Sequence, residues 1–267
     1  MRRWLFLFIL PLLFSACQQN GSQEMFERAM RLWQEQKHEE AVQNFVALTT
    51  AYPDDDLVDD ALFWVGNLYE HYLGNPDQAV RFYRTLSKNF DSSPYHHQSM
   101  TGLARVYSDQ GDDGRQKALL IYQKLQQSKL KPKDYEINQI RLSRLFIEAR
   151  QYSKARIELK RLIQTTKSQA ILPKAYHLIG QSYYMEGRLD LAEIAYLEID
   201  RRFDFGRPTL ASAMSLAQLY EEMDQLQSAI SIYESIIHRL EQREVFYQLA
   251  SDRIIKLKSR QRQTSKS

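Results

Sequence analysis

Residues 175–199, AYHLIGQSYYMEGRLDLAEIAYLEI, decide the fold of this 267-residue chain. Gly180 is followed three positions later by Tyr183, and Ala192 is followed four positions later by Tyr196. These spacings place each small residue and its aromatic neighbour on one face of an α-helix. The polar sequence MEGRLD between the two pairs predicts a short turn. The stretch therefore predicts two antiparallel helices that cross closely where their side chains are small.

The same arrangement recurs six times along the chain, at steps of 37 to 39 residues. The second helix of each repeat has an alanine followed four positions later by a large residue: Ala41 and Phe45, Ala79 and Tyr83, Ala118 and Tyr122, Ala155 and Leu159, Ala192 and Tyr196, Ala229 and Tyr233. The first helix has a small residue 12 to 14 positions before that alanine: Ala29, Gly66, Ala104, Ser143, Gly180 or Ala217. We therefore expect an all-α solenoid of about six helix pairs.

Residues 175–199 resemble the consensus of the tetratricopeptide repeat (TPR) family, as does GNLY at residues 66–69. The resemblance implies a right-handed solenoid of six TPR units over residues 24–241, and it is specific to the repeat rather than to one activity. Three features make the resemblance more specific: the period near 37, the stretch DDALFWVGNLY at residues 59–69 and the stretch NFDSSPY at residues 89–95. These features are similar to the TPR lipoprotein of the outer-membrane β-barrel assembly machine and to the Tol–Pal-associated periplasmic TPR protein.

The first seventeen residues, MRRWLFLFILPLLFSAC, have the layout of a bacterial secretory signal. Their apolar run would form a helix of about 16 Å, which is too short to span a membrane. The ending FSAC resembles a lipobox, although Phe14 stands where that motif usually has leucine. We expect residues 1–16 to be a lipoprotein signal peptide, with diacylglycerol and an N-acyl chain such as palmitate attached to Cys17. The alternative is an ordinary signal peptide that is cut nearby, with Cys17 incidental.

Residues 17–23 would then form the lipidated cysteine and a short polar tether of at most about 20 Å. Gln18 follows the cysteine, at the position where lipoproteins retained in the inner membrane have aspartate. By resemblance to bacterial lipoprotein sorting, we expect the lipid to anchor the protein in the outer membrane, facing the periplasm.

Residues 242–267 predict a capping helix and a basic tail. Phe246, Leu249, Ile254 and Leu257 lie at helical spacings that could cover the open end of the solenoid. From residue 256 onward there are five basic side chains and no acidic one. This composition suits either a solvated terminus or contact with anionic lipid head groups or an acidic partner.

The sequence offers no residues for catalysis. A single cysteine cannot close an internal disulfide or build a structural zinc site, and a net charge of +3 does not indicate nucleic acid. There is no nucleotide-binding or hydrolase motif. The adjacent His96 and His97 would point apart, and the acidic residues 54–56 would cap a helix rather than bind calcium. We expect no enzyme activity, no metal, no small-molecule substrate and no cofactor other than the lipid on Cys17.

By resemblance to TPR arrays, a concave groove is lined by the face of each first helix that does not pack within its own repeat. The predicted partner-binding residues at these positions are Phe26, Met30, Trp33, Phe63, Asn67, Glu70, Thr101, Arg105, Ile140, Arg144, Ile147, His177, Gln181, Tyr184, Met214, Gln218 and Glu221. Aromatic residues and arginine are common interface anchors, so the groove is predicted to bind protein segments. The alternative is that some of these side chains simply pack on the neighbouring repeat.

These features predict a lipid-anchored periplasmic scaffold that mediates protein–protein interactions in outer-membrane assembly, with β-barrel insertion as the leading case. A second interpretation is a pilotin-like lipoprotein that assists assembly of a secretin, pilus or motility complex. The period near 37 argues against it, because pilotin arrays typically keep 34 residues. A third, from a different class, is an accessory protein or enzyme directed at peptidoglycan.

Overall fold

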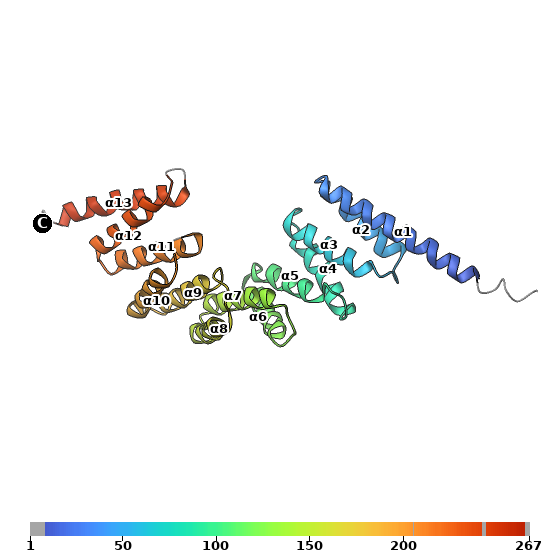
Figure 1. Cartoon of the computed structure of the whole chain (residues 1–267), viewed down its shortest axis with the longest axis horizontal. Helices are drawn as coiled ribbons and strands as arrows, with labels where there is room; N and C mark the ends of the chain where they lie inside the picture. The colour runs from blue at the N-terminus through green and yellow to red at the C-terminus, as the bar shows by residue number, and fades with distance from the viewer. Residues whose placement is uncertain (1–8, 205, 242–243, 265–267) are drawn as a thin grey trace, which may run out of the picture. The chain divides into compact units, whose positions relative to one another are not determined.

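The computed structural model describes residues 9–204, 206–241 and 244–264, and within these ranges the regular structure consists of thirteen α-helices (Figure 1). They fall into two compact units, one ending at Leu130 and the other beginning at Lys131. We call these the N-terminal unit and the C-terminal unit, and describe each by itself.

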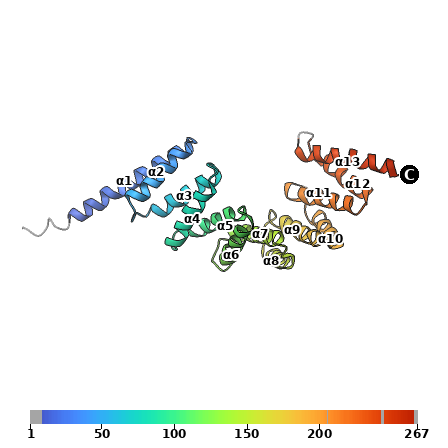
Figure 2. The same ribbon diagram turned by 180° about the vertical axis from the view of Figure 1, so that it is seen from behind.

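The N-terminal unit contains three consecutive helix pairs (Figure 2). Its helices are α1 (Ile9–Gln34), α2 (His38–Ala51), α3 (Val58–His71), α4 (Pro76–Asn89), α5 (His96–Ser108) and α6 (Gly111–Gln126). The C-terminal unit contains three more pairs and a final helix. Its helices are α7 (Pro132–Glu148), α8 (Tyr152–Thr165), α9 (Leu172–Met185), α10 (Leu189–Arg202), α11 (Arg207–Glu222), α12 (Leu226–Arg239) and α13 (Val245–Thr264). The predicted all-α architecture of six helix pairs and a terminal helix is confirmed.

Close helix crossings form where the repeated small residues lie. The six alanines of the second helices are all fully buried: Ala41, Ala79, Ala118, Ala155, Ala192 and Ala229. The ring of Tyr83 lies against Gly66, where an added Cβ would come within 2.7 Å of it. Tyr196 packs against Gly180 in the same way. A larger residue at these glycines would push the helix axes apart, as the sequence pattern predicts.

One residue in each turn between paired helices has a left-handed backbone. In the turn MEGRLD this residue is Gly187, with φ of 82°, and in two other turns it is Arg150, with φ of 57°, or Asp224, with φ of 58°. The amide of Arg150 donates to the Ile147 carbonyl and the next amide donates to the Phe146 carbonyl. These bonds form a Schellman motif, which satisfies the last carbonyls of α7 and reverses the chain into α8.

The predicted tether is helical in the structure, because α1 runs through residues 18–23. Ser22 is fully buried, and its hydroxyl donates a hydrogen bond of 2.6 Å to Asp55. Gly21 lies directly against the hydroxyl of Tyr52. These contacts with the segment between α2 and α3 hold the helix on the folded body and correct the expectation of a flexible linker. The side chain of Cys17 and residues 1–8 lie outside the described part of the chain, and no described helix is long and apolar enough to cross a bilayer.

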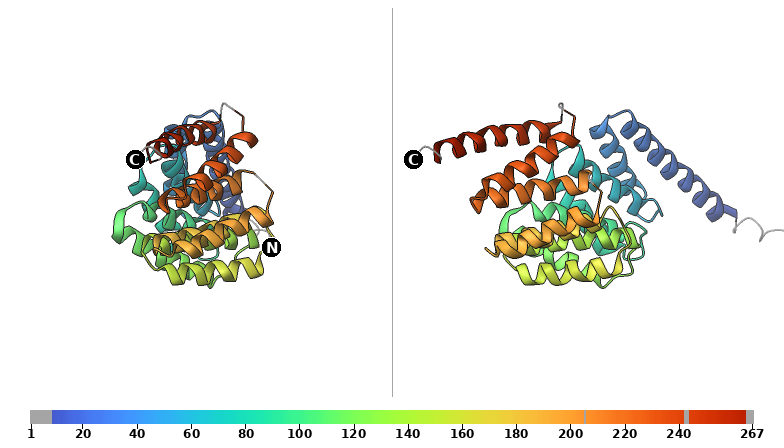
Figure 3. Two further views of the ribbon diagram at one scale, coloured as in Figure 1. Left: turned by 90° about the vertical axis from the view of Figure 1, so that its left-hand side faces the viewer. Right: turned by 60° about the vertical axis from the view of Figure 1, so that its left-hand side comes forward.

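The terminal helix α13 packs on α12, as predicted (Figure 3). The side chains that it buries differ in part from those predicted. Ile254 and Leu257 are buried in the core of the C-terminal unit together with Ala250. Phe246 and Leu249 remain 41% and 43% exposed, so their prediction as capping residues is wrong. The buried stripe runs through residues 250, 254 and 257, and this leaves the other two side chains at its edge.

Two basic residues of the predicted tail bind acidic residues of the C-terminal unit. Lys258 pairs with Glu234 of α12 at 2.8 Å, and Arg260 pairs with Asp224 at 2.9 Å. All four side chains are largely exposed, so each pair contributes little to stability.

Candidate partner-binding surface

The predicted residues of the N-terminal unit are all only half-exposed, because they also pack against neighbouring helices. They are Phe26, Met30, Trp33, Phe63, Asn67, Glu70, Thr101 and Arg105. The ring centroids of Trp33 and Trp64 are 4.8 Å apart, and those of Phe63 and Tyr95 are 4.5 Å apart. For these aromatic residues the packing alternative holds, since their rings join the helices of adjacent repeats.

Arg105 belongs to a partly buried cluster of polar side chains. Its guanidinium makes two hydrogen bonds to the carboxylate of Glu70, one of them 2.5 Å between Nη2 and Oε2. The hydroxyl of Tyr83 donates to the same carboxylate at 2.8 Å. Burial and the Glu70 charge raise the pKa of Tyr83 far above its ordinary value, so the phenol stays protonated and keeps donating. Arg105 therefore joins α5 to α3 and is not available to a partner in this arrangement.

A second cluster of the same kind lies in the C-terminal unit. The hydroxyl of Tyr233 donates to Glu221 at 2.7 Å, and Arg253 of α13 lies 3.5 Å from the same carboxylate. In both clusters the tyrosine comes from the second helix of a repeat, the glutamate from the last turn of its first helix, and the arginine from the helix that follows. In the sequence, each cluster is marked by a glutamate four residues after the repeated small residue. Its pairing with the arginine could not be predicted, because that contact joins two different repeats.

Ile140 and Ile147 are buried, which corrects their prediction as groove residues. They are 8% and 4% exposed because α7 packs against both α8 and α9. Arg144 lies between them in sequence and is exposed. No carboxylate among the described residues forms an ion pair with Arg144. Arg144 is thus a free cation at the predicted site.

His177 lies on α9 and is partly buried against α11. Its Nδ1 lies 3.1 Å from the hydroxyl oxygen of Ser212, and its ring packs near Tyr196. Burial, and to a smaller extent the nearby guanidinium of Arg144, lower the pKa of His177 from 6.5 to about 4. The imidazole is therefore neutral at physiological pH and contributes to packing rather than to a charged binding site.

The remaining predicted residues of the C-terminal unit lie on α9 and α11. Gln218 is exposed, Gln181 and Tyr184 are half-buried, and Met214 and Glu221 are half-buried within or beside the core. Glu222, which the sequence reasoning missed, accepts hydrogen bonds from the Tyr184 hydroxyl and, at 3.4 Å, from the Gln218 amide. We define the α7–α11 face by its exposed and half-exposed polar side chains: Arg144, Gln181, Tyr184, Gln218 and Glu222.

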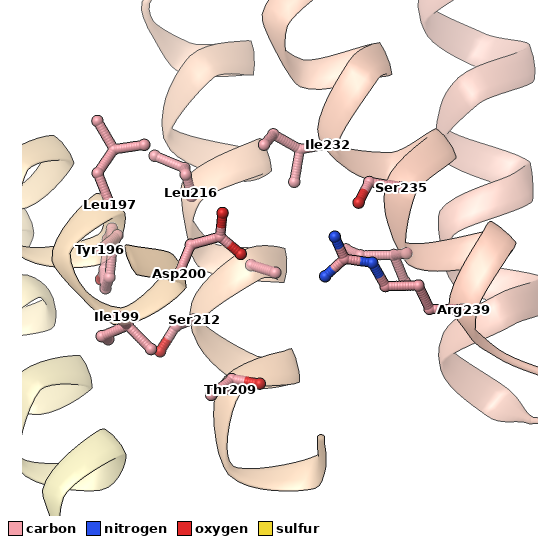
Figure 4. Close-up of a pocket in the computed structure, with 12 residues that line it drawn as sticks. Tyr196, Leu197, Ile199, Asp200, Thr209, Ser212, Leu216, Ile232, Ser235 and Arg239 are labelled. Atoms are coloured by element: carbon pink, nitrogen blue, oxygen red, sulfur yellow. The ribbon is translucent and has the colours of Figure 1, made fainter. Parts of the chain in front are cut away.

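A small cavity lies between α10, α11 and α12 in the same unit (Figure 4). Its volume is about 60 Å³, well below the several hundred Å³ of typical metabolite sites. Asp200 and Arg239 extend towards each other from its two sides, and the hydroxyls of Thr209 and Ser212 lie along its wall. In the described ranges there is no cluster of three histidine, cysteine, aspartate or glutamate side chains that could hold a metal.

Paired helices, buried small residues and left-handed turns define an all-α solenoid built from helix-pair repeats. Residues 60–93 match the tetratricopeptide repeat family. Among solved structures, PilW, a widely conserved type IV pilus biogenesis factor, is similar over 85% of this chain and 97% of its own, with a TM-score of 0.62 and 14% identity. PilF of Pseudomonas aeruginosa is similar over 88% and 98%, with a TM-score of 0.57 and 13% identity.

MamA is also similar in fold, over 70% of this chain and 98% of its own, with a TM-score of 0.57 and 16% identity. No curated protein matches the sequence. These likenesses concern the fold, and together with the repeat match at residues 60–93 they show a solenoid of TPR-like helix pairs.

Proposed function

We propose that this TPR protein is a lipid-anchored scaffold of the bacterial envelope that binds segments of other proteins during assembly of a multisubunit machine. The observation that carries the proposal is the α7–α11 face, where Arg144 is an exposed guanidinium with no carboxylate bound to it in the described structure. Its counterpart Arg105 has the same place in its repeat but is neutralised by Glu70. Of these two arginines, Arg144 is therefore the one that can bind a carboxylate of a partner.

The chemistry of this face suits an extended or helical protein segment. Arg144 offers a planar donor fork for a carboxylate, and Gln181, Tyr184 and Gln218 offer amide and hydroxyl groups for a backbone. Glu222, at the α11 side, adds a negative charge that suits a basic residue of the same segment. A partner would thus be held by hydrogen bonds and charge pairs, with no reaction at the site.

The envelope location rests on the leader and Cys17, and the choice of machine rests on separate observations. The period near 37 and the motifs at residues 59–69 and 89–95 support β-barrel assembly. The similarity of fold to PilW and PilF over nearly their whole lengths supports the alternative, a pilotin-like role in secretin, pilus or motility complex assembly. No corresponding observation favours an activity on peptidoglycan.

Capture of partners from detergent-solubilised envelopes of the native organism tests the proposal. We expect Arg144→Glu to reduce recovery of the bound partner by about tenfold. The substitution replaces the attraction between Arg144 and a carboxylate of the partner by repulsion between two carboxylates. The melting temperature should stay unchanged, since the side chain is exposed and bonds to no described carboxylate. Lys133→Glu, an exposed charge reversal on the same helix, is the matched control.

The identity of the captured protein then separates the candidate tasks. Recovery of the barrel-assembly core supports the first, and recovery of a secretin or pilus subunit supports the second. Unchanged recovery with a lowered melting temperature would mean that Arg144 is structural and that the α7–α11 face is not the binding site.

A further inference from the structure

A second surface of the C-terminal unit has the features of a docking site. An open hollow of about 380 Å³ lies between α8, α9 and α10. Its lining is mostly apolar, with Ile163 from α8, Ile179 from α9 and Leu191 from α10. The side chains of Tyr176 and Tyr183 also line it, two turns or about 10 Å apart along α9.

Ile194 extends the apolar surface of this hollow into solvent. It lines the hollow and is nevertheless 63% exposed, an unfavourable position for a large aliphatic side chain that has nothing to cover it. Ile157 occupies the equivalent position of the preceding repeat and is 57% exposed, but it does not line the hollow. The two isoleucines thus provide a matched pair, one beside the hollow and one outside it.

The charges around the hollow are unbalanced towards positive. Glu198, the acidic residue in its lining, is bound by Arg202. Lys160 lines the hollow and Arg188 lies over the Tyr183 ring, with 5.6 Å between the guanidinium carbon and the ring centroid. Both are exposed, and no carboxylate in the described ranges pairs with either. An apolar depression with two free cations at its rim is complementary to an apolar side chain with carboxylates beside it.

We propose that this hollow binds an acidic amphipathic helix of a partner protein, which inserts one large apolar side chain between α8 and α10. The inserted side chain would contact Ile163, Leu191 and Ile194, and carboxylates one turn to either side would pair with Lys160 and Arg188. A helix suits this pattern because residues three or four apart share one face. The inference is independent of the α7–α11 face, since Tyr176 and Tyr183 lie on a different side of α9 from Gln181 and Tyr184.

Binding of synthetic helical peptides to the purified chain, followed by fluorescence anisotropy, tests the inference. The probe has phenylalanine or leucine at its centre and glutamate one turn before and after it. A second peptide has lysine in place of both glutamates, and a third has alanine in place of the central residue. We expect saturable binding of the first peptide and at least about tenfold weaker binding of the other two.

Variants of the protein assign the contact. Ile194→Asp and Lys160→Glu should each weaken binding of the acidic peptide by about tenfold, with Ile157→Asp and Lys133→Glu as the matched controls that leave it unchanged. Circular dichroism spectra should be the same for all four variants, because all four side chains are exposed. Equal binding of the acidic and basic peptides, an equal loss with Ile157→Asp, or no saturable binding would overturn the inference.

Two other occupants would be recognised in the same set of samples. A dimer in sedimentation velocity that Ile194→Asp abolishes would show that a second copy covers the hollow. Co-sedimentation with phosphatidylglycerol vesicles that Lys160→Glu abolishes would show a lipid surface instead. Either result, with no saturable binding of the acidic peptide, replaces the proposed partner.

Discussion

The ring of Tyr83 is enclosed by glycines from two repeats. An added Cβ on Gly66, in the same repeat, or on Gly102, in the following one, would come within 2.7 Å of the ring. The sequence pattern predicts the role of Gly66, because it occupies the repeated small position. It does not predict the role of Gly102, since a pattern defined within one repeat contains no contact between repeats.

Gly102→Ala should therefore lower the free energy of unfolding by about 1–3 kcal/mol, even though alanine is the better helix former. The added methyl group would have to displace the Tyr83 ring, which is 1% exposed and has no free space around it. Urea denaturation followed by circular dichroism measures the change. Gln98→Ala, an exposed substitution on the same helix, is the control, and an equal or higher stability of Gly102→Ala would contradict this packing.

The pair Arg105 and Arg144 shows what the sequence can and cannot establish at a single position. Both have the same register in their repeats, and both were predicted to line the groove. The structure separates them, because Glu70 binds the first guanidinium, whereas no carboxylate in the described ranges pairs with the second. Register is therefore predictable from the repeat, whereas availability to a partner depends on the residue that the neighbouring repeat supplies.

His177 should make stability depend on pH between about 6.5 and about 4. In this range the unfolded chain binds a proton at this residue that the folded chain, with its lowered pKa, does not. The contribution of His177 is thus complete above pH 6.5 and is lost as the pH falls towards 4. The melting temperature of His177→Asn should fall less than that of the wild type between about pH 7 and about pH 5. Identical pH profiles of the two proteins would mean that His177 titrates normally.

The turns within the helix pairs reverse the chain at a single left-handed residue. Gly187 takes this conformation without strain, whereas Arg150 takes it with a Cβ that the left-handed region disfavours. The repeat pattern places the left-handed residue five positions before the buried alanine, except in the third repeat, where Gly111 lies seven positions before Ala118. It does not predict that a non-glycine residue, Arg150, adopts the left-handed conformation. The Schellman hydrogen bonds hold Arg150 in that conformation.

Arg150→Gly should raise the free energy of unfolding by up to about 1 kcal/mol, because it removes the cost of the left-handed Cβ. Gly187→Ala should lower it by a similar amount, which makes the two substitutions a reciprocal pair. Chemical denaturation of both variants is the measurement. A loss of stability in Arg150→Gly would indicate that the arginine side chain contributes a contact larger than the backbone strain.

The two ends of the chain were the elements least predictable from sequence. Residues 18–23 read as a linker because they are polar and contain a glycine, yet the burial of Ser22 and its bond to Asp55 continue α1 through them. In α13 the helical period was correct but the buried stripe was displaced towards Ala250. In both cases the decisive contact comes from another element, and local sequence does not contain it.

At the scale of the whole molecule, the proposed lipid anchor at Cys17 would determine where the protein acts. Cys17→Ala should move the protein from the membrane fraction to the soluble fraction and abolish labelling by palmitate, because the lipid has no other attachment point. Gln18→Ala, at the adjacent position, should remain labelled and membrane-bound. Retention of the unlabelled Cys17→Ala protein in the membrane fraction would show that the lipid is not the anchor.

The helical course of α1 through residues 18–23 has a consequence for orientation. An extended linker would let the folded body rotate freely about its lipid. A helix from Cys17 to Ser22 rises only about 7.5 Å and would fix the orientation of the folded body relative to the lipid. A lipid on Cys17 would therefore hold the segment around Tyr52 and Asp55 close to the bilayer surface. The bilayer would then shield one flank of the N-terminal unit, and incoming partners would have to approach from the others.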